Sequence, residues 1–554
     1  MDALAGISTR RTPQMEQADP RQILNSAGGY GFRIEDDARV HRFLVLGVDG
    51  GTYYTSERDL AKSNAEVVLR AARDRGSWLV DRIVEISTAG RAPRQNPAIF
   101  ALAAAAGLAD DDGRRAALAA LPAVCRTGFH LFLFARYVEQ LRGWGRGLRR
   151  AVAGWYTDRR PDALAYQVCK YRQREGWSHR DLLRLSHPVI SSDGPDDVAR
   201  QVVFDWVTHP VTPGAGVIGA VFREELDNGP ELFHAFMSAQ WSTSVADWVK
   251  LIERYPMSWE MLPDAALSEP DVWRALIRRG MPQTALIRQL PRLTRLGVLT
   301  GSTGQTVANQ LADSERLRFA RVHPMAVLIA LRTYASGRGA RGQSTWTPDR
   351  RIVDALDAAF YASFGAITPT GKRTLIALDV SDSMNWGQIS GLPMTPRAAS
   401  AALALVTMAS EPDCDVVAFT SRTGRGWALR SDSAITELSI SPRQRLDDVI
   451  RVVSDLPWGG TDCALPMVWA ERNHREHDTF VVITDNETWH GHIHPHQALR
   501  GYRERVVPSA RLAVVGMTAT NVSIADPGDP GSLDVAGFDS AVPNLLADFS
   551  RGSI

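Results

Sequence analysis

The sequence predicts a protein of two parts with different fold classes: an all-helical region, then an α/β domain built on a doubly wound parallel sheet. Three observations lead to this prediction. Apolar residues recur at helical spacing through residues 56–335, whereas short apolar runs alternate with helical stretches after residue 369. The chain has 554 residues, which is enough for two or more domains. The charge also divides, with 47 Lys and Arg against 40 Asp and Glu in residues 1–368, and 16 against 22 afterwards.

The composition is that of a globular protein, with 44% hydrophobic residues. The four cysteines are far apart and form no CxxC pair, which favours reduced thiols over a disulfide framework. No apolar run reaches the ~20 residues that a membrane-spanning helix needs, and no N-terminal stretch resembles a secretion signal. We therefore expect a soluble cytoplasmic protein without membrane contact, whose polar residues 1–25 form a flexible tail.

In the first region helix follows helix, and strand-like alternation is scarce. Several starts carry a capping signature, for example Ser178-His-Arg-Asp181. Many short helices without a fixed repeat length favour an array of helical pairs of the HEAT type. The spacing of apolar residues predicts helices over residues 60–74, 97–108, 113–123, 129–142, 148–156, 162–173, 178–185, 245–253 and 271–279.

After residue 369 the pattern becomes strand, helix, strand, helix. Strands buried on both faces are predicted at residues 375–378, 416–419, 480–483 and 512–515. Helices are predicted between them at residues 397–410, 442–455, 464–472 and 495–502. This alternation predicts a parallel sheet covered by helices on both faces, with ligands at the carboxyl ends of its strands.

Oxygen-bearing side chains gather at those predicted strand ends. Asp379 ends one strand and is followed by Ser381 and Ser383; Thr461 lies in a glycine loop; Asp485 ends another strand. Hard oxygen ligands of low total charge suit Mg²⁺ or another hard divalent cation, with coordination left for water or a partner's oxygen. A lone DxSxS motif often only caps a helix, so the prediction depends on the full set. A degenerate site without metal is the alternative.

Four histidines alternate in the segment Trp489-His-Gly-His-Ile-His-Pro-His496, and imidazoles so spaced could ligate zinc. No cysteine or carboxylate pair completes such a set. Helix capping and surface hydrogen bonding are the favoured roles for this segment.

Residues 142–187 hold eleven Lys and Arg against four Asp and Glu, which predicts a surface for RNA phosphates. The alternative is a solvated arginine-rich face, and we place the interleaved aromatic residues in the core. The cations form three groups: Arg142, Arg146, Arg149 and Arg150, in helical register but interrupted by glycines; Lys170 and Arg174; and Arg180, Arg184 and His187. A second candidate, residues 332–341, is either a phosphate-contacting loop or a turn.

No motif predicts an enzyme. There are no paired carboxylates with a placed base, no phosphate-binding glycine–lysine loop and no nucleophile motif. Asp379 and Asp485 with hydroxyl groups suit a binding site better than a two-metal nuclease. Nothing around Cys463 suggests an activated thiolate. The alternative to RNA binding is a metal-dependent module that scaffolds a protein partner.

Longer motifs carry a resemblance to a known family. Stretches that look like the TROVE domain of Ro autoantigen proteins include Gly50-Gly-Thr-Tyr-Tyr54, Gly145-Arg-Gly-Leu-Arg-Arg150, Lys170-Tyr-Arg-Gln-Arg174, Gly176-Trp-Ser-His-Arg-Asp-Leu-Leu-Arg-Leu-Ser-His187 and Arg321-Val-His-Pro324. Gly459-Gly-Thr-Asp-Cys-Ala-Leu-Pro-Met467 and Thr484-Asp-Asn-Glu-Thr-Trp489 resemble the family's von Willebrand A-type domain. The oxygen set resembles the metal-ion-dependent adhesion site of that domain, in which the serines and Thr461 would bind metal directly.

The resemblance implies a fold and a division of the chain. Residues 26–368 would form a ring of HEAT-like helical repeats, closed by a doubly wound von Willebrand A-type domain at residues 369–554. It also implies RNA contacts at Lys170, Arg172, Arg174 and His187; the neighbouring arginines are our extension from charge.

The resemblance further implies partners. Ro proteins bind small Y RNAs on the outer surface of the ring and 3′ ends of misfolded noncoding RNAs in its hole. Bacterial relatives act with Y-like RNAs and tether the exoribonuclease polynucleotide phosphorylase. A monomer that acts in RNA quality control is therefore expected. Residues 189–241 match the vertebrate pattern poorly, so no role is assigned to that segment.

Overall fold

The computed structural model describes residues 11–46, 57–92, 94–190, 194–209, 229–339, 344–364, 369–386, 394–420, 434–456, 459–518, 520–537 and 542–553. Two features of the sequence lie outside these ranges, the Gly50–Tyr54 motif and Arg341. Within the described ranges, no helix has both the length and the apolar character needed to cross a membrane.

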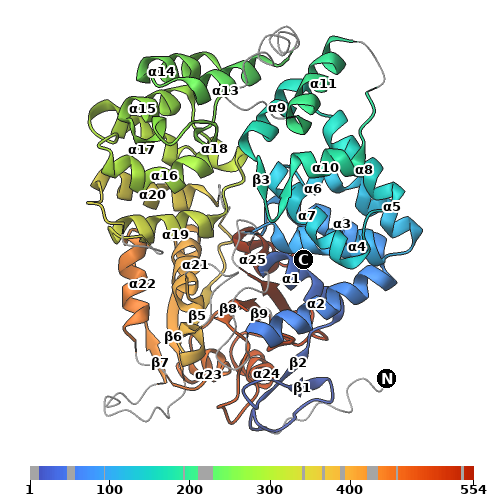
Figure 1. Cartoon of the computed structure of the whole chain (residues 1–554). Coiled ribbons are helices and arrows are strands. Elements are labelled where there is room, and N and C mark those ends of the chain that lie inside the picture. Colours follow the sequence, from blue (N-terminus) through green and yellow to red (C-terminus); the bar gives the residue numbers. More distant parts are fainter. Residues whose placement is uncertain are drawn as a thin grey trace, which may run out of the picture.

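Helices of the N-terminal region follow one another in an arc, and the α/β domain lies between the two ends of that arc (Figure 1). The first side holds α1 (Asp36–Leu46), α2 (Glu57–Asp74), α3 (Gly76–Ala89), α4 (Asn96–Leu108), α5 (Asp111–Ala119), α6 (Leu121–Val124), α7 (Gly128–Leu141), α8 (Arg146–Thr157), α9 (Pro161–Lys170), α10 (His179–Ser186) and α11 (Pro195–Thr208).

The arc continues through α13 (Glu231–Trp241) and α14 (Val245–Arg254), then the 3-10 turns η1 (Trp259–Met261) and η2 (Ala266–Ser268). Its second side holds α15 (Pro270–Arg279), α16 (Gln283–Arg295), α17 (Gly301–Ala312), α18 (Ser314–Phe319), α19 (Pro324–Ala335) and α20 (Arg350–Ala362). The nine predicted helices are therefore confirmed as helical segments, with two differences of extent.

Both differences have a local cause. The helix predicted over residues 113–123 is two helices, α5 and α6, because Pro122 has no amide hydrogen to continue the first and lies instead in the first turn of the second. The helix predicted to residue 173 ends at Lys170. The chain then forms a short hairpin of β3 (Gln173–Arg174) and β4 (Trp177–Ser178), which turns at Glu175 and Gly176 with φ of 58° and 80°.

The α/β domain has one six-stranded sheet, in the order β11-β9-β8-β5-β6-β7. All neighbours are parallel except β7, which pairs antiparallel with β6 at the edge. The strands are β5 (Thr374–Asp379), β6 (Cys414–Phe419), β7 (Ile435–Glu437), β8 (Thr479–Thr484), β9 (Arg511–Gly516) and β11 (Ser532–Ala536). The doubly wound parallel sheet is thus confirmed, and it includes all four predicted strands.

Helices cover both faces of this sheet. Alternate residues of β5 belong to different cores: Ile376 and Leu378 to the one shared with the helical region, Leu375 and Ala377 to a separate one. The shared face carries α21 (Pro396–Ser410), α22 (Leu446–Ser454) and α25 (Val542–Arg551). The other carries α23 (Leu465–Arg472) and α24 (Pro495–Arg505). The sheet is therefore packed through α21, α22 and α25 onto the helical arc.

The segment before α1 belongs spatially to the α/β domain. Strands β1 (Gln22–Leu24) and β2 (Tyr30–Arg33) form an antiparallel sheet with β10 (Val522–Ser523). Gln14 and Gln22 are buried. The prediction of a flexible tail is therefore wrong for residues 11–25. Their amides form hydrogen bonds with the α/β domain, and the local sequence does not reveal these partners.

Two ion pairs join the α/β domain to the two ends of the arc. At the first end, the buried guanidinium of Arg42 in α1 binds both carboxylate oxygens of Asp534 in β11 at 2.7 Å. At the other end, Arg445, just before α22, pairs with Asp354 in α20 at 2.7 Å. The arc of helices is thus closed by the α/β domain, as the fold prediction required.

Candidate functional site

The five oxygen-bearing residues predicted from the sequence lie at the carboxyl edge of the sheet. Asp379 ends β5, Asp485 follows β8, and Thr461 lies in the loop before α23; all five side chains are 0–3% exposed. Ser381 and Ser383 have their hydroxyl oxygens 3.0 Å apart. Burial of a polar oxygen is costly unless a ligand or a hydrogen-bond partner compensates for the lost water.

Two oxygens of this set are left without a hydrogen bond among the described residues: Thr461 Oγ1 and Asp485 Oδ2, both buried. Asp379 is held by the Ser381 amide at 2.9 Å and by the Thr484 hydroxyl at 2.6 Å. Burial, and then the charge of Asp379, raise the pKa of Asp485 to about 7. Two carboxyls that repel each other beside unpartnered oxygens fit the donor set of a hard divalent cation.

Two residues that the sequence analysis did not identify, Arg397 and Gln14, hold the carboxyl edge of the sheet in place. Arg397 in α21 is buried and donates to the Ser381 carbonyl at 3.0 Å and to the Val380 carbonyl. Gln14 donates to Asp462 Oδ1 at 2.8 Å and accepts from the Thr488 hydroxyl. No sequence signal marks Gln14. Arg397 could have been suspected, because an arginine opening a strongly apolar helix must find a buried partner.

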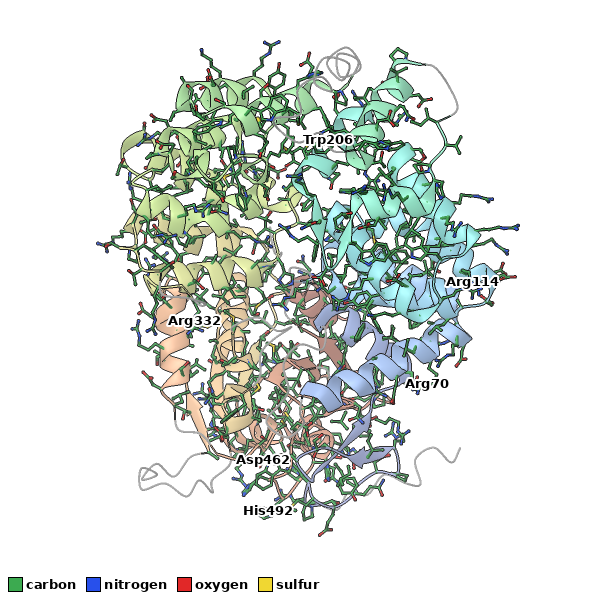
Figure 2. The ribbon with its side chains drawn as sticks, in the orientation of Figure 1. Arg70, Arg114, Trp206, Arg332, Asp462 and His492 are labelled. Carbon is green, nitrogen blue, oxygen red and sulfur yellow. The ribbon has the colours of Figure 1, made fainter. Side chains whose placement is uncertain are left out.

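The histidine segment serves the fold. His494 caps α24; its Nδ1 accepts from the Gln22 amide at 3.1 Å and its Nε2 donates to the Glu16 carbonyl at 2.8 Å. Burial lowers the pKa of His494, which favours this neutral form. His492 lies beside Asp462 at the end of the domain (Figure 2). Among the described residues, no three or more His, Cys, Asp or Glu side chains are grouped as metal ligands of these types alone.

Most of the predicted RNA-contacting cations are exposed on neighbouring elements. Arg146, Arg149 and Arg150 share one face of α8, which packs against α10 with Arg180 and Arg184. Arg142 lies outside α8, because α7 ends at Leu141 and the chain turns at Gly143. In the described part of the chain, no carboxylate forms an ion pair with the guanidinium groups of Arg146, Arg149, Arg150, Arg172, Arg174, Arg180 or Arg184.

The hairpin and the end of α10 complete this surface. Arg172 and Arg174 are exposed, and β3 packs on α7. His187, also exposed, follows α10 with φ of 45°. Of the five interleaved aromatic residues, Trp155 and Tyr156 are fully buried, as the core interpretation predicted. Trp144, Tyr171 and Trp177 are only partly buried and pack against the same core.

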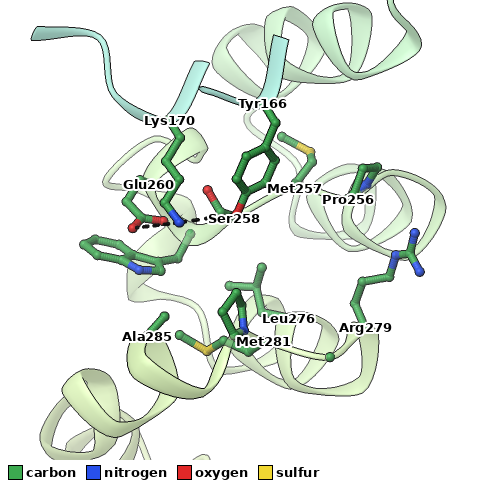
Figure 3. Close-up of a pocket in the computed structure, with 13 residues that line it drawn as sticks. Tyr166, Lys170, Pro256, Met257, Ser258, Glu260, Leu276, Arg279, Met281 and Ala285 are labelled. Carbon is green, nitrogen blue, oxygen red and sulfur yellow. Dashed lines mark hydrogen bonds and ion pairs between the residues drawn. The ribbon is translucent and has the colours of Figure 1, made fainter. Parts of the chain in front are cut away.

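Lys170 is placed differently from the arginines. Its ammonium lies 3.7 Å from Glu260 Oε1 and 3.3 Å from the Tyr166 hydroxyl, and its side chain is only 11% exposed. It lies in the wall of a cavity between α9, η1 and the start of α16 (Figure 3). An RNA contact at Lys170 therefore requires a part of the RNA that enters this cavity.

The arginines of the second basic candidate, residues 332–341, lie in two different structural settings. Arg332 lies in the last turn of α19, close to where the helical arc meets the α/β domain (Figure 2). Arg338 forms an antiparallel bridge with Thr345, and the Trp346 amide bonds to the Gly337 carbonyl at 2.9 Å. This geometry is that of a turn leading into Trp346.

Comparisons with known proteins agree with this arrangement. A family model described as the TROVE domain matches residues 23–213 and 217–372, and one described as the Ro60 vWA domain matches residues 373–550. The relative "RNA-binding protein RO60" of Deinococcus radiodurans is 37% identical over 559 residues, which cover 100% of this chain and 99% of that protein. "RNA-binding protein RO60" of Caenorhabditis elegans is 34% identical over 608 residues, covering 98% and 92%.

A solved structure is similar over almost the whole chain. It is the crystal structure of the Deinococcus radiodurans RO (RSR) protein, with a TM-score of 0.67 and 37% sequence identity. The similarity covers 94% of this chain and 100% of that one.

Proposed function

The chain belongs to the Ro family, whose members join a TROVE domain to a von Willebrand A-type domain, and from this premise we propose that it is an RNA-binding protein without enzymatic activity. One observation carries the proposal: exposed arginines of α8, the β3–β4 hairpin and α10 form a surface without carboxylate partners in the described chain. Such cations neutralise phosphates.

The RNA that we propose is a small structured, Y-like noncoding RNA, together with the 3′ ends of misfolded RNAs. A ribonucleoprotein of this kind would act in cytoplasmic RNA quality control or degradation, as a monomer, with polynucleotide phosphorylase as its partner nuclease. The support for these particulars is the family resemblance of the motifs Lys170–Arg174 and Gly176–His187.

We further propose that the edge formed by Asp379, Ser381, Ser383, Thr461 and Asp485 binds Mg²⁺ or another hard divalent cation. Ser381, Ser383 and Thr461 would be direct ligands, with the two aspartates binding directly or through water. The unpartnered buried oxygens of Thr461 and Asp485 support this assignment. The bound cation would supply an open coordination position for water or a partner's carboxylate.

That metal site supports a second candidate function, a module that binds a protein partner. Trp386, three residues after Ser383, is 59% exposed. Tryptophan is enriched at the centres of protein interfaces. A carboxylate of the partner would then complete the coordination while Trp386 packs against its surface.

The RNA proposal is tested by a binding titration with a structured RNA that carries a single-stranded 3′ tail, alongside the same RNA without the tail. Wild type should bind the tailed RNA more tightly, and affinity should fall steeply with salt. The double variant Arg172→Ala, Arg174→Ala should lose at least about tenfold in affinity, since each phosphate contact contributes to binding.

A matched control is the double variant Arg316→Ala, Arg318→Ala, which removes two exposed arginines of α18 that pair with carboxylates. Its affinity should equal that of wild type. No binding by wild type at low salt would overturn the RNA proposal and leave the metal-dependent protein partner.

A further inference from the structure

A cavity of about 240 Å³ opens between α9 and the second half of the helical arc. Tyr166 projects into it from α9, and Leu276, Met281 and Ala285 line the opposite side (Figure 3). The space is smaller than a typical drug-sized ligand site of roughly 300–1,000 Å³. It therefore suits a single small ring system.

The walls combine apolar surfaces with a few polar groups. Trp259 adds a second aromatic side chain to that of Tyr166. The Ser258 hydroxyl and Glu260 Oε2 are buried and have no hydrogen-bond partner among the described residues. A polar atom left in this state is destabilising unless water or a ligand supplies its partner. Ser258 itself is only 5% exposed.

We propose that this cavity receives one unstacked nucleobase of a bound RNA strand, an inference that rests on the proposed RNA-binding function. Tyr166 would stack on the face of the base, because every base presents a π surface to an aromatic side chain. Leu276 and Met281 would contact the opposite face. A folded RNA offers such bases in its loops, bulges and single-stranded ends.

The polar groups favour one base. An ionised carboxylate only accepts hydrogen bonds, so Glu260 selects a base edge that donates. Guanine presents two neighbouring donors to this carboxylate, N1–H and the N2 amino group. Lys170 lies beside Glu260, where its ammonium would donate to the O6 of the guanine. Guanine is therefore the expected occupant.

The cavity adjoins the exposed arginines. Lys170 is the last residue of α9, and Arg172 and Arg174 follow in the hairpin, within a few residues' reach of the chain. Arg279, which is exposed, lines the cavity from the other side. A strand whose phosphates contact the hairpin arginines could place a base in the cavity while Arg279 meets the adjoining phosphate.

The experiment is a binding titration with a set of RNAs derived from one bound sequence. Each unpaired position is in turn made abasic, and the critical position is then changed to each other base. Wild type should show one position at which loss of the base costs about tenfold or more in affinity, the range expected for one stacked base. Guanine should bind most tightly there.

Two variants test whether that base lies in the cavity. Ala285→Phe fills the cavity and should make the abasic and intact RNAs bind equally. Glu260→Gln, which keeps the shape, should abolish the preference for guanine while leaving the cost of the abasic change. The exposed control Ala265→Phe should behave as wild type. Circular dichroism and thermal melting check that each variant folds.

The outcomes separate the two proposals. If wild type binds RNA but no abasic position matters, or if Ala285→Phe folds and keeps the abasic penalty, the nucleobase site is wrong and RNA binding stands. If wild type binds no RNA, both fail. A titration with GMP alone distinguishes a free nucleotide from a base within RNA. GMP binding that Ala285→Phe abolishes, without any abasic penalty in RNA, would overturn the RNA-borne base.

Discussion

Gln14 and Asp462 are 448 positions apart in the sequence, yet the Gln14 side-chain amide donates to the Asp462 carboxylate at 2.8 Å. The same amide donates to the Ile493 carbonyl, and its oxygen accepts from the Thr488 hydroxyl. Asp462 follows Thr461, and Thr488 lies three residues after Asp485. One buried side chain of the N-terminal segment thus ties together two loops of the candidate metal site.

Removal of the Gln14 side-chain hydrogen bonds should weaken cation binding. Gln14→Ala should lower the affinity for Mg²⁺ by about tenfold or more, because groups that orient metal ligands typically contribute 10–100-fold. Isothermal titration calorimetry measures this directly. Gln17→Ala, in the same segment but exposed, is the matched control. Equal affinities for both variants would show that Gln14 does not position the site.

The cation should also stabilise the folded protein, since a ligand that binds only the native state raises its melting temperature. Ser383→Ala and Asp379→Asn should each abolish the rise that Mg²⁺ produces. Asp379→Asn should in addition be no less stable than wild type in EDTA, because it relieves the repulsion between Asp379 and Asp485. Differential scanning calorimetry with and without Mg²⁺ checks this. A Mg²⁺ effect that survives both substitutions would place the cation elsewhere.

RNA contacts on α8 should appear in the salt dependence of binding. Arg149→Ala and Arg150→Ala should each reduce the slope of log affinity against log salt by roughly 0.7–0.9, the value for one lost phosphate contact. The loss should be similar for RNAs of different sequence, because phosphates carry no sequence information. Fluorescence anisotropy in a salt series measures the slope. An unchanged slope would exclude α8 from the RNA surface.

The Arg42–Asp534 pair should be a major link between the two domains. Arg42 is buried, so Asp534→Ala leaves a guanidinium charge without its partner and should cost about 3–5 kcal/mol. Asp354→Ala, which breaks the exposed pair with Arg445, should cost only about 0–1 kcal/mol. Urea unfolding gives both values. Similar losses of unfolding free energy for the two variants would show that the buried ion pair contributes no more to stability than the exposed one.

Buried histidines should make the protein sensitive to acid. Burial lowers the pKa of His179 to about 3 and that of His323 to about 4. An unfolded histidine titrates near 6.5, so between about pH 6.5 and 4 the unfolded state binds more protons. The free energy of unfolding is therefore undiminished above this pH range. It falls as the pH is lowered through the range, by up to about 1.4 kcal/mol per pH unit for each histidine.

His179→Gln tests one of these contributions. Between pH 6 and 5 its unfolding free energy should depend less steeply on pH than that of wild type, by up to about 1.4 kcal/mol per pH unit. The exposed His187→Gln should leave the dependence unchanged. Urea unfolding across this range measures the difference. Parallel pH profiles for His179→Gln and wild type would contradict the assignment.

Local patterns in the sequence were sufficient for part of the secondary structure and for the residues of the candidate metal site. Apolar spacing identified part of the helices and four of the six strands of the main sheet, because burial imposes a period of 3.6 residues on helices and continuous apolar runs on strands covered on both faces. Asp379, Ser381, Ser383, Thr461 and Asp485 could be assembled because parallel strands place their carboxyl ends at one edge.

Other features depend on contacts between distant segments. No local pattern distinguishes the N-terminal segment from a tail, because Gln14, Gln22 and Asn25 look like solvated polar residues until their partners are known. Apolar periodicity alone extends the helix of residues 162–173 too far. The helix ends at Lys170, because the hairpin that turns at Glu175 and Gly176 follows it. Lys170 and Arg174 share one motif, yet packing of α9 against η1 buries the first and leaves the second exposed. Residue type and spacing thus determined which elements form, whereas tertiary packing decided which polar groups lose water and therefore need partners.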